Sequence, residues 1–414
     1  MTPSAESNVR LEISGIAAGG DGVGRTEGMV VFVPRTAPGD VVRVALARSK
    51  RFARGLLESV EISSPDRITP PCPHYTRDRC GGCQLQHLSY VAQLRAKGSI
   101  ITDALRRIGH RDTGAVEVEP SDAEWRYRRK LTLHLRRDGS SWTAGLHPYD
   151  DPVAVFDLQD CPITEERVLA VWAELRGAFE HLPRERALRV AVRLLADGAA
   201  VVVEGGGAWP YADRLFAAVP SIAELWWKPD HGRMRRLAAR TSESQSGASF
   251  AQVNARVAAR LQSHVLDRVR SYAPHRVIDA YAGVGSTSVP LAAEGVTVTA
   301  IELDAEAVAR FADRLAPPSR ALVGRVEEHL RSALPADVVL LNPPRAGTDA
   351  RVTEALQAVA APPHAILYVS CDPATLARDL SRMPRYRLAA VRAYDMFPQT
   401  AHVETVCELV PEAA

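Results

Sequence analysis

The segment AILYVSCDPATLARD, residues 365–379, decides how we interpret the fold of this chain. Its first five residues form an apolar run of the kind that a buried parallel strand needs. Pro373 and the residues after it indicate a helix, because proline is favoured in the first helical turn. Cys371 therefore lies where a strand becomes a helix, the edge at which open α/β sheets bind ligands. Such a thiol is a candidate nucleophile, although most single cysteines are small buried hydrophobic residues.

The sequence around this segment alternates between strand and helix patterns from position 250 onward. Four apolar runs predict parallel strands, near 276–280, 296–302, 336–341 and 365–369. The helices that we expect before and between them lie near 255–270, 286–294 and 305–316. Two more strands are expected, near 386–394 and 402–410. This order predicts a doubly wound, Rossmann-like sheet.

We expect three domains in the 414 residues. Residues 1–62 hold four or five short strand patterns with glycine and proline turns, which predicts a small OB-like β-barrel. Residues 63–245 are expected to form a central α+β domain, and residues 246–414 the domain with the doubly wound sheet. The predicted fold class is therefore a multidomain α/β protein with an N-terminal barrel.

The composition is that of a soluble globular protein, with 46% apolar residues, 24% charged residues and a formal net charge of +2. This balance does not by itself indicate a nucleic-acid-binding protein, but it leaves room for local basic patches. No apolar run approaches the roughly 20 residues of a transmembrane helix, and residues 1–10 lack a signal-peptide core. We expect a cytoplasmic protein whose six cysteines do not form disulfides.

Four of the cysteines are spaced like the ligands of a metal centre. Cys72, Cys80 and Cys83 form a Cys-x7-Cys-x2-Cys pattern, and Cys161 follows much later, before a proline. A Cys-x2-Cys pair can place two thiolates on one centre, and the two glycines between this pair give the tight turn that this requires. The spacing allows either tetrahedral zinc or a [4Fe–4S] cluster.

Basic and aromatic residues interleave between Trp125 and Lys130. Such a pattern suits a phosphate backbone and stacked bases, so Arg128, Arg129 and Lys130 are candidate RNA contacts. A solvated, charged strand edge would give the same pattern.

The C-terminal domain carries the signature of an adenosine-containing cofactor. Gly283-x-Gly285 follows the first strand and lets the backbone approach a ligand. Glu302 ends the second strand about 20 residues later, where an acid binds ribose hydroxyls. Ser288 stands where a dinucleotide fingerprint would have its third glycine, which favours S-adenosylmethionine, a cofactor without a pyrophosphate. Asn342 begins an Asn-Pro-Pro-Arg turn that also fits a methyltransferase, although its arginine replaces the aromatic residue of amino-methyltransferases.

A methyltransferase domain would give Cys371 a chemical task. Carbon 5 of a pyrimidine is a poor nucleophile, but a thiolate added at carbon 6 makes an enolate that can attack a sulfonium methyl group. A base must then remove the carbon 5 proton, and His402 and Glu404 near the final strands both offer one. Without a methyltransferase site around Cys371, we would interpret His402 and Glu404 as ordinary surface or core residues. Cys407 lies on a predicted strand and is expected to pack there.

Together these residues resemble the RNA (uracil-5-)-methyltransferase family, which modifies uridines in large-subunit rRNA and tRNA. The resemblance covers nearly the whole chain, and residues 15–40 resemble a TRAM domain. The most specific matches are YVSCDPATLARD at 368–379, FAQVN at 250–254, PPRAG at 343–347 and FPQTAHVE at 397–404.

The resemblance implies that Cys371 is the nucleophile, that Glu404 is the base, and that the product is 5-methyluridine in RNA, with rRNA favoured over tRNA. It implies [4Fe–4S] ligation by Cys72, Cys80, Cys83 and Cys161, and S-adenosylmethionine contacts from Gln252, Tyr281, Gly283, Gly285, Glu302 and Asn342. No membrane association and no obligate protein partner are expected.

The chain departs from the family at three places. Family members usually carry Asp at the position of Asn342, and many carry Asn at that of Ser286. The first gap between the cysteines is longer than in some relatives.

Three other interpretations fit the same residues. A non-catalytic iron–sulfur RNA-binding protein could keep this fold without binding the cofactor. A cytosine-5 RNA methyltransferase would use the same thiol chemistry on another base. Zinc could replace the cluster in the same enzyme.

Overall fold

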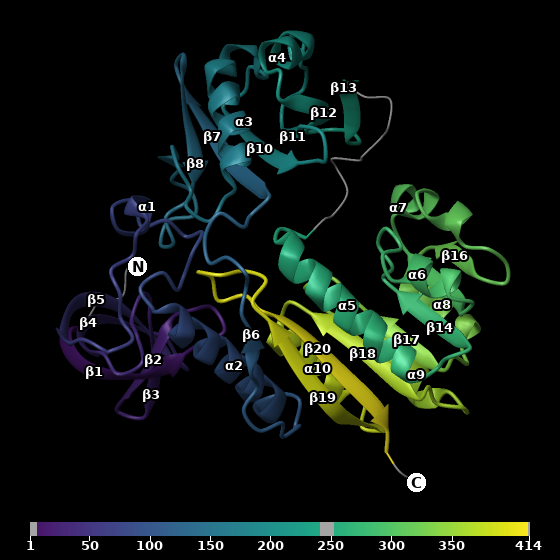
Figure 1. Cartoon of the computed structure of the whole chain (residues 1–414). Helices are drawn as coiled ribbons and strands as arrows, with labels where there is room; N and C mark the ends of the chain where they lie inside the picture. Colours follow the sequence, from purple (N-terminus) through teal and green to yellow (C-terminus); the bar gives the residue numbers. More distant parts are fainter. Residues whose placement is uncertain (1–5, 241–251, 413–414) are drawn as a thin grey trace.

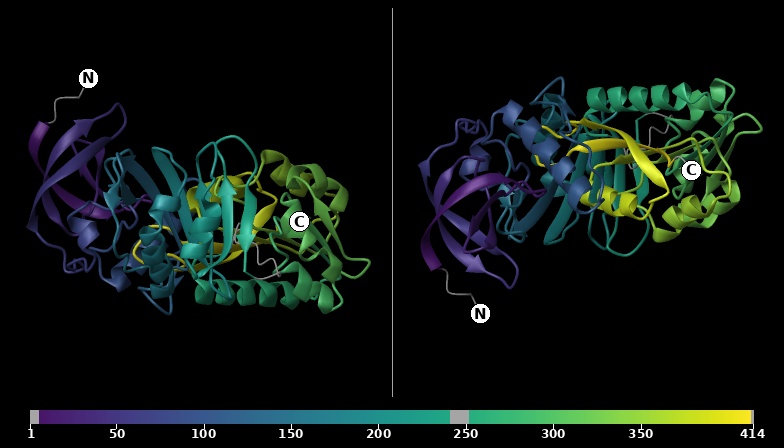
Figure 2. Two further views of the ribbon diagram at one scale, coloured as in Figure 1. Left: turned by 90° about the horizontal axis from the view of Figure 1, so that it is seen from above. Right: turned by 90° about the horizontal axis from the view of Figure 1, so that it is seen from below.

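The computed structural model describes residues 6–240 and 252–412 and shows an elongated molecule with the N-terminal barrel at one end (Figures 1 and 2). The barrel is closed, with strand order β1-β2-β3-β5-β4, as the sequence predicts. Its strands are β1 (Glu6–Ile16), β2 (Gly22–Thr26), β3 (Met29–Val33), β4 (Val41–Arg48) and β5 (Ala53–Ile62). Alternate apolar side chains, among them Ile13, Val33 and Val44, are buried inside it.

The central part is built on a seven-stranded sheet of order β13-β12-β11-β10-β7-β8-β9. Its strands are β7 (Lys130–Asp138), β8 (Ser141–Leu146), β9 (Phe156–Asp157), β10 (Ala187–Leu194), β11 (Ala199–Glu204), β12 (Ile222–Lys228) and β13 (Arg235–Ala239). Helices α3 (Glu166–Gly177) and α4 (Ala212–Ala218) pack on one face of it through Trp172 and Leu215. The short helix α1 (Pro73–Thr76) and the 3₁₀ turn η1 (Phe179–His181) complete this part.

The C-terminal part is an eight-stranded sheet of order β16-β15-β14-β17-β18-β20-β19-β6. Its strands are β14 (Arg276–Ala280), β15 (Thr297–Glu302), β16 (Arg320–Val323), β17 (Val338–Leu341), β18 (Ala365–Ser370), β19 (Tyr386–Tyr394) and β20 (Glu404–Pro411), with β6 (Val118–Glu119) at the edge. Strands β14 to β18 are parallel, whereas β20 runs antiparallel to both β18 and β19. The predicted doubly wound sheet is therefore present, with an antiparallel pair added.

Helices cover both faces of this sheet (Figure 1). One face packs against α8 (Val326–Ala333), α9 (Ala350–Ala358) and α10 (Pro373–Ser381), and the other against α5 (Ala255–Ser271) and α6 (Ser288–Ala293). The helix expected at 305–316 is shorter: α7 (Ala305–Ala309) is followed by the 3₁₀ turn η2 (Ala312–Arg314), ahead of Pro317. Among the residues described, no helix is long and apolar enough to cross a membrane.

A segment that precedes the central sheet in sequence belongs to the C-terminal sheet in space. Helix α2 (Tyr90–Arg107) packs against α10, and β6 pairs with β19. Ile101 and Val118 thus join the apolar cluster that contains Tyr368 and Leu376. The predicted domain boundaries remain a prediction, because residues 63–245 contribute to both sheets.

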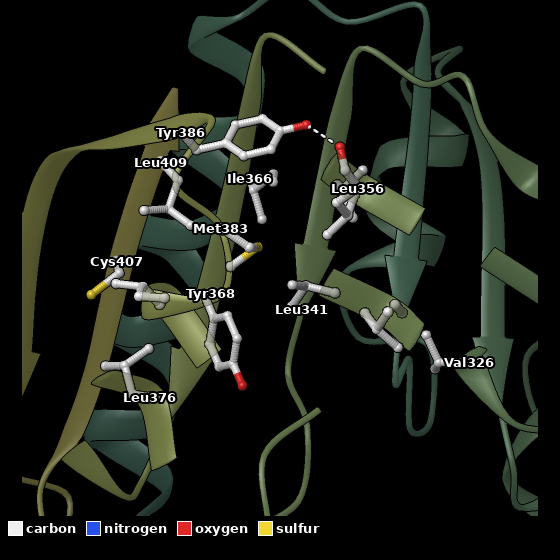
Figure 3. Close-up of a cluster of buried hydrophobic side chains, with 14 of the residues drawn as sticks. Val326, Leu341, Leu356, Ile366, Tyr368, Leu376, Met383, Tyr386, Cys407 and Leu409 are labelled. Atoms are coloured by element: carbon white, nitrogen blue, oxygen red, sulfur yellow. Dashed lines mark hydrogen bonds between the residues drawn. The ribbon is translucent and has the colours of Figure 1, made fainter. Parts of the chain in front are cut away.

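This apolar cluster fixes the strand–helix turn that carries Cys371. Figure 3 shows Tyr368, from the end of β18, and Leu376, from the start of α10, in the same cluster. Both are fully buried, as is Cys407, which packs on β20 as expected. Core packing on both sides leaves the turn between them little freedom.

Candidate active site

Cys371 lies in a tightly bonded turn between β18 and α10. Asp372 caps the helix, because its Oδ1 accepts hydrogen bonds from the backbone N–H groups of Ala374 (3.0 Å) and Thr375 (2.9 Å). Ser370 Oγ accepts from the Asp372 N–H at 3.1 Å. Pro373 occupies the first helical turn. The thiol is therefore half-buried on rigid backbone at the carboxyl end of a parallel strand.

Glu404 lies across from this thiol on the neighbouring strand. In the antiparallel β18–β20 pair Ser370 is opposite Thr405, so the next position on each strand brings Cys371 opposite Glu404. Glu404 is only 5% exposed. Burial raises the pKa of its carboxyl to about 7, against the opposing charge of Arg345. A carboxyl with a pKa near 7 is well suited to accept a proton at neutral pH.

Arg345 also lies close enough to Cys371 to change its pKa, which the sequence did not indicate. Burial and then the charge of Glu404 raise the pKa of Cys371. The charge of Arg345 and a hydrogen bond from it act in the opposite direction and lower this pKa. Burial and then Arg345 also lower the pKa of His402. The sequence places Arg345 just after β17, but only the structure shows that β17 is the neighbour of β18, which brings Arg345 to the end of the strand that carries Cys371.

Helix α10 holds the loop that carries Arg345. Arg378 Nη2 donates to the Ala346 carbonyl at 2.7 Å. The fully buried Asp379 accepts from the Thr348 N–H (2.8 Å) and the Tyr368 hydroxyl (2.6 Å). Arg378 and Asp379, at the end of the segment 365–379, thus fix the loop that carries Arg345.

The glycine turn after β14 is hydrogen-bonded to Glu302. The Gly283 N–H donates to one carboxylate oxygen of Glu302 at 2.8 Å, and the Asp304 N–H donates to the other at 2.9 Å. Gly283 and Gly285 have positive φ values of 58° and 74°. A Cβ at Gly285 would lie 2.4 Å from the Phe311 ring, so this position requires glycine.

A buried acid holds the far end of this turn. Asp279 is 2% exposed and accepts hydrogen bonds from the hydroxyls of Thr287 and Ser288. Ser288, the residue that breaks the dinucleotide fingerprint, is thus a structural contact. The pKa of Asp279 is raised because the carboxyl is buried.

The parallel register gathers the other predicted cofactor residues at the same edge. Strands β15, β14, β17 and β18 are successive neighbours, and Glu302, Tyr281, Asn342 and Cys371 lie at or just after their carboxyl ends. The Asn342 N–H donates to the Ala280 carbonyl at 3.3 Å, and its side chain is exposed. Gln252 is half-buried just before Asn254, which caps α5. Phe250 and Ala251 lie outside the described residues.

The four predicted metal-ligating cysteines, Cys72, Cys80, Cys83 and Cys161, all line one cavity of about 120 Å³. Burial raises the pKa of the Cys80 thiol to about 12, and the Gly82 N–H donates to its sulfur at 3.4 Å. Within residues 6–240 and 252–412, no three Cys, His, Asp or Glu side chains converge as around a single ion. The cavity thus offers four thiols that are brought together but not focused on one point.

The candidate RNA contacts have different surroundings. Arg128 lines the cysteine cavity, and its Nε donates to the Lys130 carbonyl at 2.9 Å. Arg129 lies 3.5 Å from Glu165. Lys130 is opposite Arg193 in the sheet, and burial and then Arg193 lower its pKa. Tyr127 cannot stack on a base, because it is 6% exposed and lies in the apolar cluster around Cys72 and Cys83.

Comparisons with known proteins agree with this arrangement. Residues 324–410 match the family model of tRNA (uracil-5-)-methyltransferases, and residues 7–55 match the TRAM domain. An uncharacterized RNA methyltransferase of Protochlamydia amoebophila is 32% identical, with 97% of this chain and 98% of the relative covered. One of Thermosynechococcus vestitus is also 32% identical, with the same coverage.

A solved structure is similar over the whole length. The crystal structure of Pyrococcus abyssi tRNA (uracil-54, C5)-methyltransferase in complex with S-adenosyl-L-homocysteine has a TM-score of 0.72 and 25% sequence identity. The match covers 97% of this chain and 100% of that one. The barrel, the central part and the C-terminal sheet thus recur together.

Proposed function

Because the chain belongs to the RNA (uracil-5-)-methyltransferase family, we propose that it transfers a methyl group from S-adenosylmethionine to carbon 5 of a uridine in RNA. The observation that carries this proposal is the pairing of Cys371 with the buried Glu404 beside Arg345, at the sheet edge that also bears the glycine turn. S-adenosylmethionine would supply the methyl group as an electrophilic sulfonium.

Cys371 acts first in the proposed reaction. Its thiolate adds to carbon 6 of the uracil, and the C5=C6 electron pair moves onto carbon 5 and the carbonyl to give an enolate. The enolate forms a bond from carbon 5 to the methyl carbon, and the sulfonium sulfur leaves with the electron pair. Arg345 supports this step, because a cation beside the thiol favours the thiolate.

Glu404 completes the reaction. Its carboxylate removes the proton from carbon 5, and the electron pair of that C–H bond restores the C5=C6 double bond. The C6–S bond breaks, and Cys371 leaves as a thiolate. The pKa of about 7 gives Glu404 enough basicity for this step while about half of it stays ionised at pH 7.

The cofactor would lie along the carboxyl edge of β14, β15 and β17. Glu302 already accepts two backbone N–H groups, and the remaining lone pairs of its carboxylate would accept the ribose hydroxyls. Gly283 and Gly285 would let the backbone approach the ligand, with Tyr281, Gln252 and Asn342 around it. Asn342 keeps hydrogen-bonding capacity in place of the more usual carboxylate.

For the cysteine cavity we propose a [4Fe–4S] cluster rather than zinc. In a cluster each cysteine binds a different iron atom, so the four thiols need not converge on one point as tetrahedral zinc ligands must. All four cysteines line the cavity, and the N–H···S bond to Cys80 is of the kind that stabilises cluster sulfurs. Because the proposed reaction transfers no electrons, the cluster would be structural.

The RNA would be held by cations from two parts of the chain. Arg129 and Lys130 of the central part lie near Arg193, and burial and then the charges of Arg129 and Arg310 lower the pKa of Arg193. Arg310 caps α7 in the C-terminal part, so the charges gather where the two parts face each other. Such a site suits a phosphate backbone, and the uridine must be flipped out for carbon 6 to be attacked. The preference for rRNA stays a prediction.

The test is the transfer of labelled methyl from S-adenosylmethionine to RNA of a strain that lacks the gene, followed by nucleoside analysis. We expect the label in 5-methyluridine, and mapping it in rRNA and tRNA identifies the substrate. Label in 5-methylcytidine, or full activity of Cys371→Ala, would contradict the proposal. The same strain complemented with the wild-type gene is the control.

A further inference from the structure

The connector between β19 and β20, residues 395–403, leads directly into Glu404 and is held from the N-terminal half of the chain. Its contacts come from helix α2 and from residues next to the cysteine cavity. No step of the proposed reaction uses these contacts, yet the connector that they hold ends at the residue that would remove the proton.

Helix α2 holds the connector through two buried side chains. Gln93 forms a reciprocal pair with Gln399: its Oε1 accepts from the Gln399 N–H and its Nε2 donates to the Gln399 Oε1, both at 2.9 Å. Lys97 Nζ lies 2.5 Å from Asp395 Oδ1 and donates to the Phe397 carbonyl at 3.0 Å. The Lys97 and Asp395 side chains are fully buried.

Residues next to the cysteine cavity hold the same connector. The N–H groups of Gln84 and Leu85, which directly follow Cys83, both donate to the Gln399 carbonyl, at 3.1 and 3.0 Å. The hydroxyl of Tyr127, which packs with Cys72 and Cys83, donates to the Pro398 carbonyl at 2.9 Å.

The backbone conformation of Gln399 shows that these contacts hold it in place. Its φ is +71°, in a region that non-glycine residues seldom occupy. Such a conformation persists only when its surroundings fix it, and here four hydrogen bonds to Gln84, Leu85 and Gln93 do so. Gln399 is five positions before Glu404, with β20 beginning at the latter.

We propose that the four-cysteine cavity positions the catalytic base: its contents fix Gln84 and Leu85, these fix the connector, and Gln93 and Lys97 act as positioning residues for Glu404. This inference rests on the proposed role of Glu404. It gives the cysteine centre a function in a reaction that needs no electrons.

The first test is Gln93→Ala in the full chain, isolated without oxygen, with Val91→Ala as the control. Val91 lies on the same helix and is 64% exposed. Displacement of the base slows turnover by up to about 100-fold with little change in KM, because placement errors near 1 Å have effects of that size. The covalent protein–RNA adduct should accumulate, since Cys371 still adds but proton removal is slow.

RNA containing 5-fluorouridine separates the two proposals. Fluorine at carbon 5 leaves no proton for Glu404 to remove, so the adduct is trapped whatever the position of the base. Gln93→Ala should trap this RNA as fast as the wild type. A wild type that traps none would overturn the role of Cys371, whereas a Gln93→Ala protein that turns over normally would overturn only the positioning role.

The second test asks whether the cavity controls the connector. Lys97 variants would be poor tests, because they leave a buried carboxylate unpaired. Hydrogen exchange of residues 395–403 is instead compared before and after the metal is removed with oxidant and chelator. We expect faster exchange in the connector and unchanged exchange in β4. Unchanged exchange in the connector, or a protein that holds no metal as isolated, would overturn this role of the cavity.

Discussion

Glu404→Gln should stabilise the C-terminal sheet at neutral pH while it abolishes turnover. A pKa raised from 4.5 to about 7 means that the folded state prefers the neutral carboxyl. As pH rises from 4.5 to 7, the folded protein keeps a proton that the unfolded chain has lost, so stability falls with pH over this window. Above pH 7 the stability lost by ionising this buried carboxyl reaches about 3 kcal/mol. Glutamine is neutral, so the variant loses no stability in this way.

The assay is native-state hydrogen exchange of the β20 amides between pH 4 and 8. The free energy of unfolding of the variant should exceed that of the wild type by about 3 kcal/mol at pH 8, and the difference should vanish near pH 4. Glu408→Gln is the matched control. Glu408 lies on the same strand and is 6% exposed, but hydrogen bonds from Arg268 lower the pKa of its carboxyl. That variant should lose stability at pH 8. A Glu404→Gln protein that is also less stable at pH 8 would refute the reasoning.

Three further predictions follow from the site. Arg345→Met should slow adduct formation by about 10- to 100-fold, because hydrogen bonds to charged groups contribute about 1.5–3 kcal/mol. It should also shift to higher pH the limb of the pH–rate profile on which the rate rises as the thiol ionises; an unchanged profile would show that Arg345 does not stabilise the thiolate. Glu302→Ala should weaken S-adenosylmethionine binding by a similar factor in calorimetry, whereas trapping rates at saturating cofactor stay the same; equal affinity would exclude the ribose contact. Anaerobic protein should be brown with broad visible absorbance and lose this colour in Cys83→Ser, whereas a colourless wild-type protein that contains zinc would contradict the cluster.

The sequence predicted most of what depends on local pattern. The closed barrel, the parallel strands β14, β15, β17 and β18 and the packing of Cys407 are all confirmed, because alternating and continuous apolar runs determine them. Strand β16 was not predicted. The glycine turn follows β14 and Glu302 ends β15, as the spacing predicts, whereas the hydrogen bond from the Gly283 N–H to Glu302 is a finding of the structure. The position of Cys371 at the end of β18 was likewise predictable from the local sequence.

Long-range packing could not be predicted from these patterns. The attachment of α2 and β6 to the C-terminal sheet joins Ile101 to Leu376, residues far apart in the chain. The role of Arg345 depends on which strand lies beside β18, and the burial of Tyr127 depends on its packing against Cys72 and Cys83. In each case tertiary contacts, rather than propensity or periodicity, decide the environment of the side chain.

The most direct test of the account is peptide mass spectrometry of the Glu404→Gln protein after reaction with S-adenosylmethionine and unmodified RNA. The account predicts a nuclease-trimmed nucleotide, heavier than uridylate by one methyl group, on the peptide that contains Cys371. Methylation of the RNA without any adduct, or an adduct on another cysteine, would contradict the claim that Cys371 is the nucleophile.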